Sequence, residues 1–373
     1  MTLSCNKTSL QDALGLAVRA VASRSTLPIL ECVLLTASPD NGLTLSASNL
    51  DLSIDTAPID ANITVAGAVA VDAKLFAEIV RKMPGDSISI TVDEKYNVQL
   101  KSGRSKLNIM GQPADDFPVQ DNATISAGAN SYILNNQVVK DMIRQTIFSV
   151  STDMSKLILT GELIEVKENN LRMVAVDMYR ISYKSTTLPE GSADAKAVVP
   201  AKALNELSRM LPIGESETVA VQLSGNRIIF AASNFTLTSN LLEGEFIRYD
   251  QIFNEDFLTI VNVDRDQLLS TFERAVLIAS ENKMLPTKLQ IEDDVIKVTS
   301  VNEKGETSEE DIPCSTEGKA LTISFNPRYF IDALRAIDEE NITLKLNTQL
   351  SPCTIKGSEE NYKYLIVPLR PEA

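Results

Sequence analysis

The fold is decided by Asp72-Ala-Lys-Leu-Phe-Ala-Glu-Ile-Val-Arg-Lys-Met-Pro84, a segment that the chain repeats twice at a spacing of about 128 residues. The second copy reads Pro200-Ala-Lys-Ala-Leu-Asn-Glu-Leu-Ser-Arg-Met-Leu-Pro212, and the third reads Asn326-Pro-Arg-Tyr-Phe-Ile-Asp-Ala-Leu-Arg-Ala-Ile337. Apolar residues recur in register at positions i, i+1, i+4 and i+5, which form one stripe along a helix. The sequence therefore predicts three equivalent amphipathic helices.

The polar face of these helices repeats as well, in the order cation, acid, cation. The three sets are Lys74, Glu78 and Arg81; Lys202, Glu206 and Arg209; and Arg328, Asp332 and Arg335. A repeat of both the buried and the exposed face indicates a function that needs three similar surfaces.

Two further elements follow the same period. A helical pattern occurs at 10–21, 138–150 and 267–279, and a short strand that ends in Asn or Asp occurs at 43–49, 171–177 and 296–302. The period is much longer than that of solenoid repeats, so it indicates three domains of one kind. Alternating strands outnumber the helices, which predicts an α+β fold with two helices on an antiparallel sheet in each domain. Polar stretches at 120–131 and 254–257 suggest the domain bounds 1–125, 126–253 and 254–373.

The composition is that of a globular protein, with 44% hydrophobic and 23% charged residues. No apolar run is long enough to span a membrane, and the first residues lack the basic and apolar segments of a secretory signal. The four cysteines, Cys5, Cys32, Cys314 and Cys353, are scattered without metal or redox spacing. These features indicate a cytoplasmic protein with reduced thiols and no contact with membranes.

The chain contains no histidine, and this argues against most enzyme chemistry. Without histidine there is neither a Ser-His-Asp triad nor a His-ligated metal site, and the glycines form no phosphate-binding fingerprint. The acidic clusters 292–294, 309–311 and 338–340 have Mg²⁺-type ligands, but their neighbours favour solvated loops between strands. We therefore expect no catalytic residues, no metal and no cofactor, with a metal-dependent hydrolase as the disfavoured alternative.

The net charge of −15 argues at first against a nucleic-acid partner. However, the six repeated helical segments together carry +5, so the rest of the chain carries −20. Basic helices and acidic strands and loops give the molecule two electrostatic faces. Charge alone leaves two interpretations open: the helices meet phosphates, or their oppositely charged neighbours support the helices themselves.

Several segments resemble the bacterial DNA polymerase III beta subunits, the sliding clamps, in the right order along essentially the whole chain. They are Arg24-Ser-Thr-Leu-Pro-Ile-Leu30, Ser102-Gly-Arg-Ser-Lys106, Pro113-Ala-Asp-Asp-Phe-Pro118 and Val198-Val-Pro-Ala-Lys202. The resemblance implies a head-to-tail homodimer whose six domains form a ring around double-stranded DNA, with helices inside and sheets outside. It also implies that the protein tethers the replicative polymerase as a non-catalytic processivity factor. The alternative is a multidomain scaffold that binds proteins without encircling DNA.

The family's DNA-facing positions correspond here to Arg24, Lys74, Lys156, Lys202 and Arg209. Contacts to phosphates and water carry no sequence information and permit sliding. The family's dimer interface corresponds to Leu75, Leu107 and Ile109 at one end of the chain and to Leu277 and Ile278 at the other. Leu75 also lies on the apolar stripe of its helix, so a place in the core is the alternative for this residue.

The resemblance also implies a groove that binds peptides of the polymerase III catalytic subunit, the clamp loader, other polymerases and repair proteins. Its positions are Leu159, Val176, Met178, Tyr179, Arg180, Ile181, Ile247, Ile252, Leu365, Val367, Pro368, Leu369 and Arg370. Apolar residues around an arginine suit a peptide with hydrophobic anchors. The family's usual Thr-Asp-Gly-His-Arg-Leu reads Val176-Asp-Met-Tyr-Arg-Ile181 here, and Ile247 replaces a usual proline. These bulky replacements predict a reshaped groove.

Overall fold

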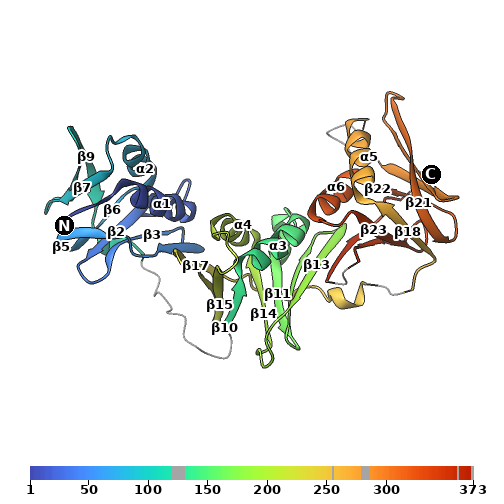
Figure 1. The fold of residues 1–373 in the computed structure, drawn as a ribbon, viewed down its shortest axis with the longest axis horizontal. Helices are drawn as coiled ribbons and strands as arrows, with labels where there is room; N and C mark the ends of the chain where they lie inside the picture. The colour runs from blue at the N-terminus through green and yellow to red at the C-terminus, as the bar shows by residue number, and fades with distance from the viewer. Residues whose placement is uncertain (119–130, 254–255, 279–285, 359–360, 371–373) are drawn as a thin grey trace. The chain divides into compact units, whose positions relative to one another are not determined.

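The structure, a computed structural model, describes residues 1–118, 131–253, 256–278, 286–358 and 361–370. The chain forms two compact units, each built on one antiparallel sheet (Figure 1). The first unit comprises Met1–Val139 and Glu206–Leu241, and the second comprises Lys140–Asn205 and Leu242–Ala373. Both units therefore include part of the middle repeat. The predicted domain bounds 1–125, 126–253 and 254–373 stay a prediction, and the polar stretch at 120–131 lies almost entirely outside the described residues.

The first unit contains a 13-stranded sheet in the order β10-β15-β16-β17-β4-β3-β2-β6-β9-β8-β7-β1-β5. Its strands are β1 (Thr2–Asn6), β2 (Cys32–Ser38), β3 (Gly42–Ser48), β4 (Leu52–Thr56), β5 (Ala61–Val65), β6 (Gly67–Asp72), β7 (Ser87–Val92), β8 (Asn97–Ser102), β9 (Ser105–Gln112), β10 (Ser131–Asn135), β15 (Thr218–Ser224), β16 (Arg227–Ala231) and β17 (Phe235–Asn240). Helices α1 (Lys7–Ala17) and α2 (Ala73–Lys82) pack against each other in this unit.

The second unit contains a 12-stranded sheet in the order β14-β11-β12-β13-β25-β24-β23-β18-β21-β20-β19-β22. Its strands are β11 (Gly161–Lys167), β12 (Asn170–Val176), β13 (Arg180–Thr187), β14 (Ala195–Pro200), β18 (Thr259–Asp264), β19 (Thr287–Glu292), β20 (Val295–Val301), β21 (Thr307–Gly318), β22 (Leu321–Phe325), β23 (Asn341–Leu346), β24 (Cys353–Lys356) and β25 (Tyr362–Ile366). Helices α5 (Arg265–Ile278) and α6 (Pro327–Ala336) belong to it, and α3 (Asn136–Thr146) and α4 (Ala201–Met210) include residues of both units.

All six predicted helices are present, and the first helix of each repeat begins in the same way. The side chains of Asn6, Asn135 and Asp264 each accept a hydrogen bond from a backbone N–H two or three residues later. The next residue then donates its own backbone N–H to the loop after the second helix of the same repeat, where the acceptors are the carbonyls of Asp86, Glu217 and Glu340. Capping side chains and a fixed entry point thus explain why these helices start where they do.

The predicted strands that end in Asn or Asp lead into equivalent turns in all three repeats. Asn49, Asp177 and Asn302 each accept two backbone N–H bonds from the next few residues through Oδ1, at 2.7–3.1 Å. In each turn the same residue also donates its backbone N–H, to the carbonyl of Leu52, Arg180 or Glu306, so side chain and backbone stabilise the turn together. The turns connect β3 to β4, β12 to β13 and β20 to β21, so the repeated sequence pattern corresponds to a repeated hairpin.

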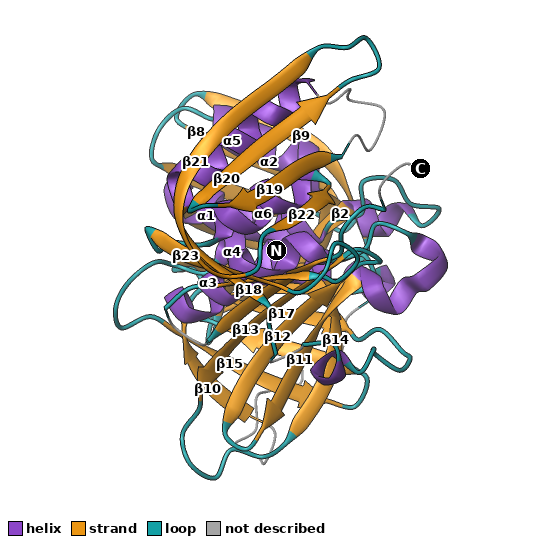
Figure 2. Cartoon of the chain, turned by 90° about the vertical axis from the view of Figure 1, so that its right-hand side faces the viewer, coloured by secondary structure: helices purple, strands orange, loops and turns teal. Residues whose placement is uncertain are grey.

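The helices cover the sheets as an α+β two-layer fold requires. In the second unit, Phe272 of α5 stacks on Phe330 of α6 with ring centroids 4.6 Å apart, and Phe325 of β22 packs edge-on against Phe330. Figure 2 shows α5 and α6 beside the strands of this sheet, and α5 contacts β18, β20 and β21. Aromatic packing of this kind adds to the free energy of burying the rings.

No described helix is long and apolar enough to cross a membrane.

Glu162 on β11 is an exception to the pattern of buried apolar residues. Its side chain is fully buried, and neither carboxyl oxygen has a hydrogen-bond partner in the structure. The nearby Thr146 hydroxyl donates to the Met142 carbonyl at 2.6 Å. Burial raises the pKa of Glu162 to about 8, so this carboxyl is largely protonated at neutral pH.

We expect the free energy of unfolding to fall as the pH rises from 4.5 to about 8, because over this range the unfolded chain ionises Glu162 while the folded chain keeps the proton. The shift corresponds to a loss of about 5 kcal/mol. Glu162→Gln should remove most of this slope, as urea unfolding at several pH values would show. Glu94→Gln, at an exposed turn, should leave the slope unchanged. Parallel curves for wild type and Glu162→Gln would contradict the assignment.

Candidate DNA-facing, dimer and partner-binding surfaces

In the first repeat, two predicted DNA-facing cations flank one end of a strand pair. Strands β2 and β6 meet where Cys32 pairs with Asp72. Arg24 lies in the segment that leads into β2, and Lys74 lies in the first turn of α2, which begins directly after β6. Both side chains are exposed. The two cations, 50 residues apart in the sequence, thus belong to segments that adjoin the same end of one strand pair.

The second repeat has the same arrangement. Strands β11 and β14 meet where Gly161 pairs with Pro200. Lys156 lies in the short 3-10 segment Met154–Thr160 that leads into β11, and Lys202 lies in the first turn of α4, directly after β14. Both are exposed. Lys156 and Lys202 are thus the positional equivalents of Arg24 and Lys74.

The third repeat supplies a candidate that the family positions missed. Strands β19 and β22 meet where Thr287 pairs with Phe325, and exposed Arg328 follows in the first turn of α6. The repeat itself carried this signal, because Arg328 stands in register with Lys74 and Lys202. The segment that leads into β19, residues 279–285, lies outside the described residues.

The acid of the repeated triplet pairs with the second cation, which leaves the first cation available. Glu78 pairs with Arg81 at 2.5 Å, and Glu206 pairs with Arg209 at 3.1 Å. Among the described residues, Lys74, Lys202 and Arg328 form no ion pair. The exposed Glu78–Arg81 pair contributes about 0.5 kcal/mol to its helix, whereas Glu206 is half-buried and pairs with Arg19 as well, at 2.8 Å. The second cation is therefore engaged within its own helix, whereas the first forms no such pair.

Two of the predicted interface residues of the first unit, Leu107 and Ile109, lie on an open sheet edge, and the third, Leu75, lies on α2. Among the described residues, β9 pairs over 105–110 only with β8, on one side, and β6 reaches only the last two residues of the strand. Leu107 is 41% exposed, and Leu75 on α2 is 49% exposed. Ile109 is half-buried, and the strongly exposed Met110 of the same edge was not predicted. Leu75 therefore does not belong to the core of this unit.

The interface residues of the second unit lie at the end of α5. Leu277 is 79% exposed and Ile278 is half-buried. The neighbouring strand β21 has an open edge of its own, since in the part of the chain that the structure describes its residues 307–312 pair only with β20. This stretch includes the acidic run 309–311, whose Glu310 pairs with Arg274 of α5.

Six of the predicted groove residues form one apolar cluster in the second unit, which we name the groove cluster. Leu159, Val176, Ile181 and Leu365 are buried in it, and Ile247 and Val367 pack against it from more exposed positions. Tyr183, Tyr249 and Phe253 belong to the same cluster but were not predicted. Sequence reasoning missed them because a single aromatic residue in a strand (Tyr183) or in a connector (Tyr249 and Phe253) gives no recognisable pattern.

The unusual pair Met178 and Tyr179 lies at the turn beside this cluster. Met178 is 62% exposed, whereas the Tyr179 ring stacks on Tyr329 of α6 with centroids 6.0 Å apart. The carbonyl of Tyr179 accepts the backbone N–H of Val367, and Leu369 donates its N–H to Ser324. The C-terminal segment, including buried Pro368 and exposed Arg370, is thus held against the turn, and Ile252 lies exposed on the connector that follows β17.

The guanidinium of Arg180 binds groups of the protein itself. Its guanidinium pairs with Asp177 at 2.9 Å and with Asp332 at 2.6 Å, and it donates to the Phe148 carbonyl at 2.7 Å. The same group lies 4.6 Å from the centroid of the Tyr329 ring. Because Asp332 is occupied in this way, Arg335 pairs with Glu273 of α5 instead, and the third triplet departs from the first two.

The comparisons with known proteins cover the whole chain. Family models of the DNA polymerase III beta subunit match residues 1–121 for the N-terminal domain, 133–247 for the central domain and 250–370 for the C-terminal domain. A beta sliding clamp of Streptococcus pneumoniae is 32% identical over 378 residues and covers 98% of both chains. The chain belongs to the DNA polymerase III beta subunit family.

Solved structures agree with this assignment. The clamp matches a putative DNA polymerase III beta subunit from Eubacterium rectale with a TM-score of 0.94 and 36% identity over 99% of both chains. It matches the Bacillus subtilis sliding clamp with a TM-score of 0.95 and 28% identity over the full length of both. The prediction of three α+β clamp domains with antiparallel sheets is confirmed. The clamp is the processivity factor of DNA polymerase III and a non-catalytic subunit.

The contacts of Arg180 predict a stability effect. Arg180→Met should lower the free energy of unfolding by about 2–4 kcal/mol, because it leaves Asp177 and the Phe148 carbonyl without their partner. Arg180→Lys should recover little, since an ammonium cannot serve three acceptors in the same plane. The matched control is Arg248→Met, an exposed arginine whose nearest carboxylate is 4.0 Å away, with an expected change below about 0.5 kcal/mol. Equal losses in urea unfolding would show that Arg180 is not structural.

Proposed function

We propose that two copies of the clamp close head-to-tail into a ring around double-stranded DNA. The observation that carries this proposal is a rule of strand pairing. The last strand of the second repeat, β17, pairs with β4, and the last strand of the third repeat, β25, pairs with β13. In both cases the partner strand is the one that follows the Asn or Asp turn of the preceding repeat.

Only one pair of equivalent strands is left over in this scheme. One is β9, the last strand of the first repeat, which has an open edge. The other is β21, the strand that follows the turn at Asn302, whose edge is open over residues 307–312. Joining β9 of one copy to β21 of another repeats the same pairing. A heterologous contact that closes after two copies gives a ring, and pairing removes the exposed edges.

Charge supports the same pairing. The edge around β9 carries Lys101, Arg104 and Lys106, whereas the open stretch of β21 carries Glu309 and Asp311. Complementary charges set register and partner choice at an interface. Leu75, Leu107, Ile109, Leu277 and Ile278 would supply the apolar part of this junction.

We propose that Arg24, Lys74, Lys156, Lys202 and Arg209 face the DNA, together with Arg328. Their equivalent positions in successive repeats would place similar cations around the ring. A few cations in a protein of net charge −15 give weak, sequence-independent contacts to phosphates, so sliding stays fast. Retention then comes from topology rather than from affinity.

The groove cluster and the turn at Met178 would bind hydrophobic peptide motifs of the polymerase III catalytic subunit, the clamp loader, other polymerases and repair proteins. The apolar floor suits such anchors. Arg180 would position the turn instead of contacting the peptide, because its donors are occupied. Since bacterial chromosomes are replicated in the cytoplasm, the clamp would act there.

We predict that the clamp, once loaded on closed circular DNA, stays bound at about 1 M NaCl, at which phosphate contacts are strongly screened. Cutting the circle should release it, because a ring slides off a free end. Gel filtration of the loaded circle before and after linearisation measures both states. Equal retention on the two forms, with a steep loss in salt, would support the scaffold alternative.

We also predict that Arg104→Glu with Lys106→Glu weakens the dimer by about tenfold or more, because like charges would then meet across the junction. Adding Glu309→Lys and Asp311→Lys to the same chain should restore most of the dimer, although Glu309 also loses its pair with Lys297. Sedimentation measures the dimer fraction. Lys95→Glu in the exposed turn between β7 and β8 is the charge control, and a similar loss there would refute the proposed junction.

A further inference from the structure

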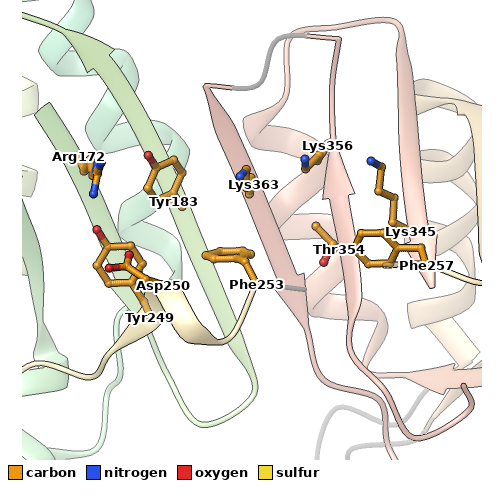
Figure 3. Close-up of a pocket in the computed structure, with 10 residues that line it drawn as sticks. All are labelled: Arg172, Tyr183, Tyr249, Asp250, Phe253, Phe257, Lys345, Thr354, Lys356 and Lys363. Carbon is orange, nitrogen blue, oxygen red and sulfur yellow. The ribbon is translucent and has the colours of Figure 1, made fainter. Parts of the chain in front are cut away.

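A cavity of about 450 Å³ lies in the second unit, beyond the predicted groove residues. Five adjacent strands, β12, β13, β25, β24 and β23, form its floor, and the connector that follows β17 forms its wall (Figure 3). The lining consists of Arg172, Tyr183, Tyr249, Asp250, Phe253, Phe257, Lys345, Thr354, Lys356 and Lys363. Four cations and one carboxylate thus face one cavity in a protein of net charge −15.

Glu165, an acid outside the lining, is engaged by groups other than Lys345 and Lys363. Glu165 of β11 lies between Arg172 at 3.5 Å and Lys196 at 3.8 Å, and it accepts a hydrogen bond from the Tyr249 hydroxyl at 2.6 Å. Lys345 and Lys363 form no ion pair with any described residue. They lie over the rings of Phe257 and Phe253, at 5.5 and 5.9 Å from the centroids.

The cavity continues directly from the groove cluster. Tyr183, Tyr249 and Phe253 belong to both, and Tyr183 packs against each of the other two rings at 6.1 Å. A peptide whose hydrophobic anchors occupy the groove would therefore place its flanking residues over the cavity. Lysines over aromatic rings present a positive surface that suits carboxylates.

We propose that this cavity binds an acidic segment that flanks the hydrophobic motif of a partner protein. The inference rests on the proposed peptide groove and adds a charge requirement to it. A single-stranded nucleic acid suits the cavity less well, because base stacking needs open ring faces. Here the rings pack on one another, and the lysines cover Phe253 and Phe257.

The test uses two labelled synthetic peptides with the same Leu and Phe anchors. One carries Glu-Asp-Glu-Glu at both ends, and the other carries Gln-Asn-Gln-Gln. Fluorescence anisotropy with the intact clamp should show about tenfold tighter binding of the acidic peptide at low salt, and the difference should shrink as salt screens the charges. In Lys345→Gln with Lys363→Gln, the preference should fall below about twofold, while the amide peptide binds as it does to wild type.

The double variant Lys95→Gln with Lys304→Gln is the matched control, because it makes the same change in net charge at exposed turns elsewhere and should keep the preference. Lys345→Arg with Lys363→Arg should keep it as well. Equal binding of both peptides to wild type, or an unchanged preference in the glutamine variant, would overturn the cavity proposal alone. Failure of both peptides to bind would overturn the groove and the cavity together. Lysine-dependent binding of oligothymidine, without discrimination between the peptides, would assign the cavity to nucleic acid instead.

Discussion

The pairing of strands between repeats is the interaction on which the rest of the clamp depends. Strand β17 joins β4, and β25 joins β13, so each sheet contains strands of two consecutive repeats. Backbone hydrogen bonds in a central ladder are protected from water and hold the strands in register. This constraint explains why the compact units divide the middle repeat, and why β9 and β21 remain with open edges.

The same ladders decide where the cations lie. A strand pair ends at a defined residue, and the helix that follows it starts with a cation in its first turn, as Lys74, Lys202 and Arg328 show. The position of each cation therefore follows from the register of the sheet, and no ion pair of the cation itself is needed to hold it there. Weak contacts between such cations and phosphates would suit a clamp, since strong phosphate binding would slow its movement along the duplex.

Local patterns in the sequence predicted the local structure well. Helix stripes and the turns at Asn49, Asp177 and Asn302 depend on neighbours within a few residues, so the repeats revealed them. Contacts between distant segments were beyond such patterns. Arg180 meets Asp332 across 152 residues, and Glu162 is fully buried beside Thr146, the last residue of α3. The division into two compact units also depends on strand pairing between repeats, which leaves no local signal in the sequence.

The third repeat shows how a symmetric chain acquires a specific site. Asp332 occupies the position that supports the second cation of the helix in the other repeats, but here it pairs with Arg180 and fixes the turn that carries Met178 and Tyr179. Arg335 takes Glu273 as a substitute partner, so the helix keeps an ion pair. The ion pair between Asp332 and Arg180 thus connects α6 of the third repeat to the proposed peptide site in the second. Since the fold already pairs these two repeats through β13 and β25, the proposed groove and the cationic cavity occur where the sheet itself is continuous.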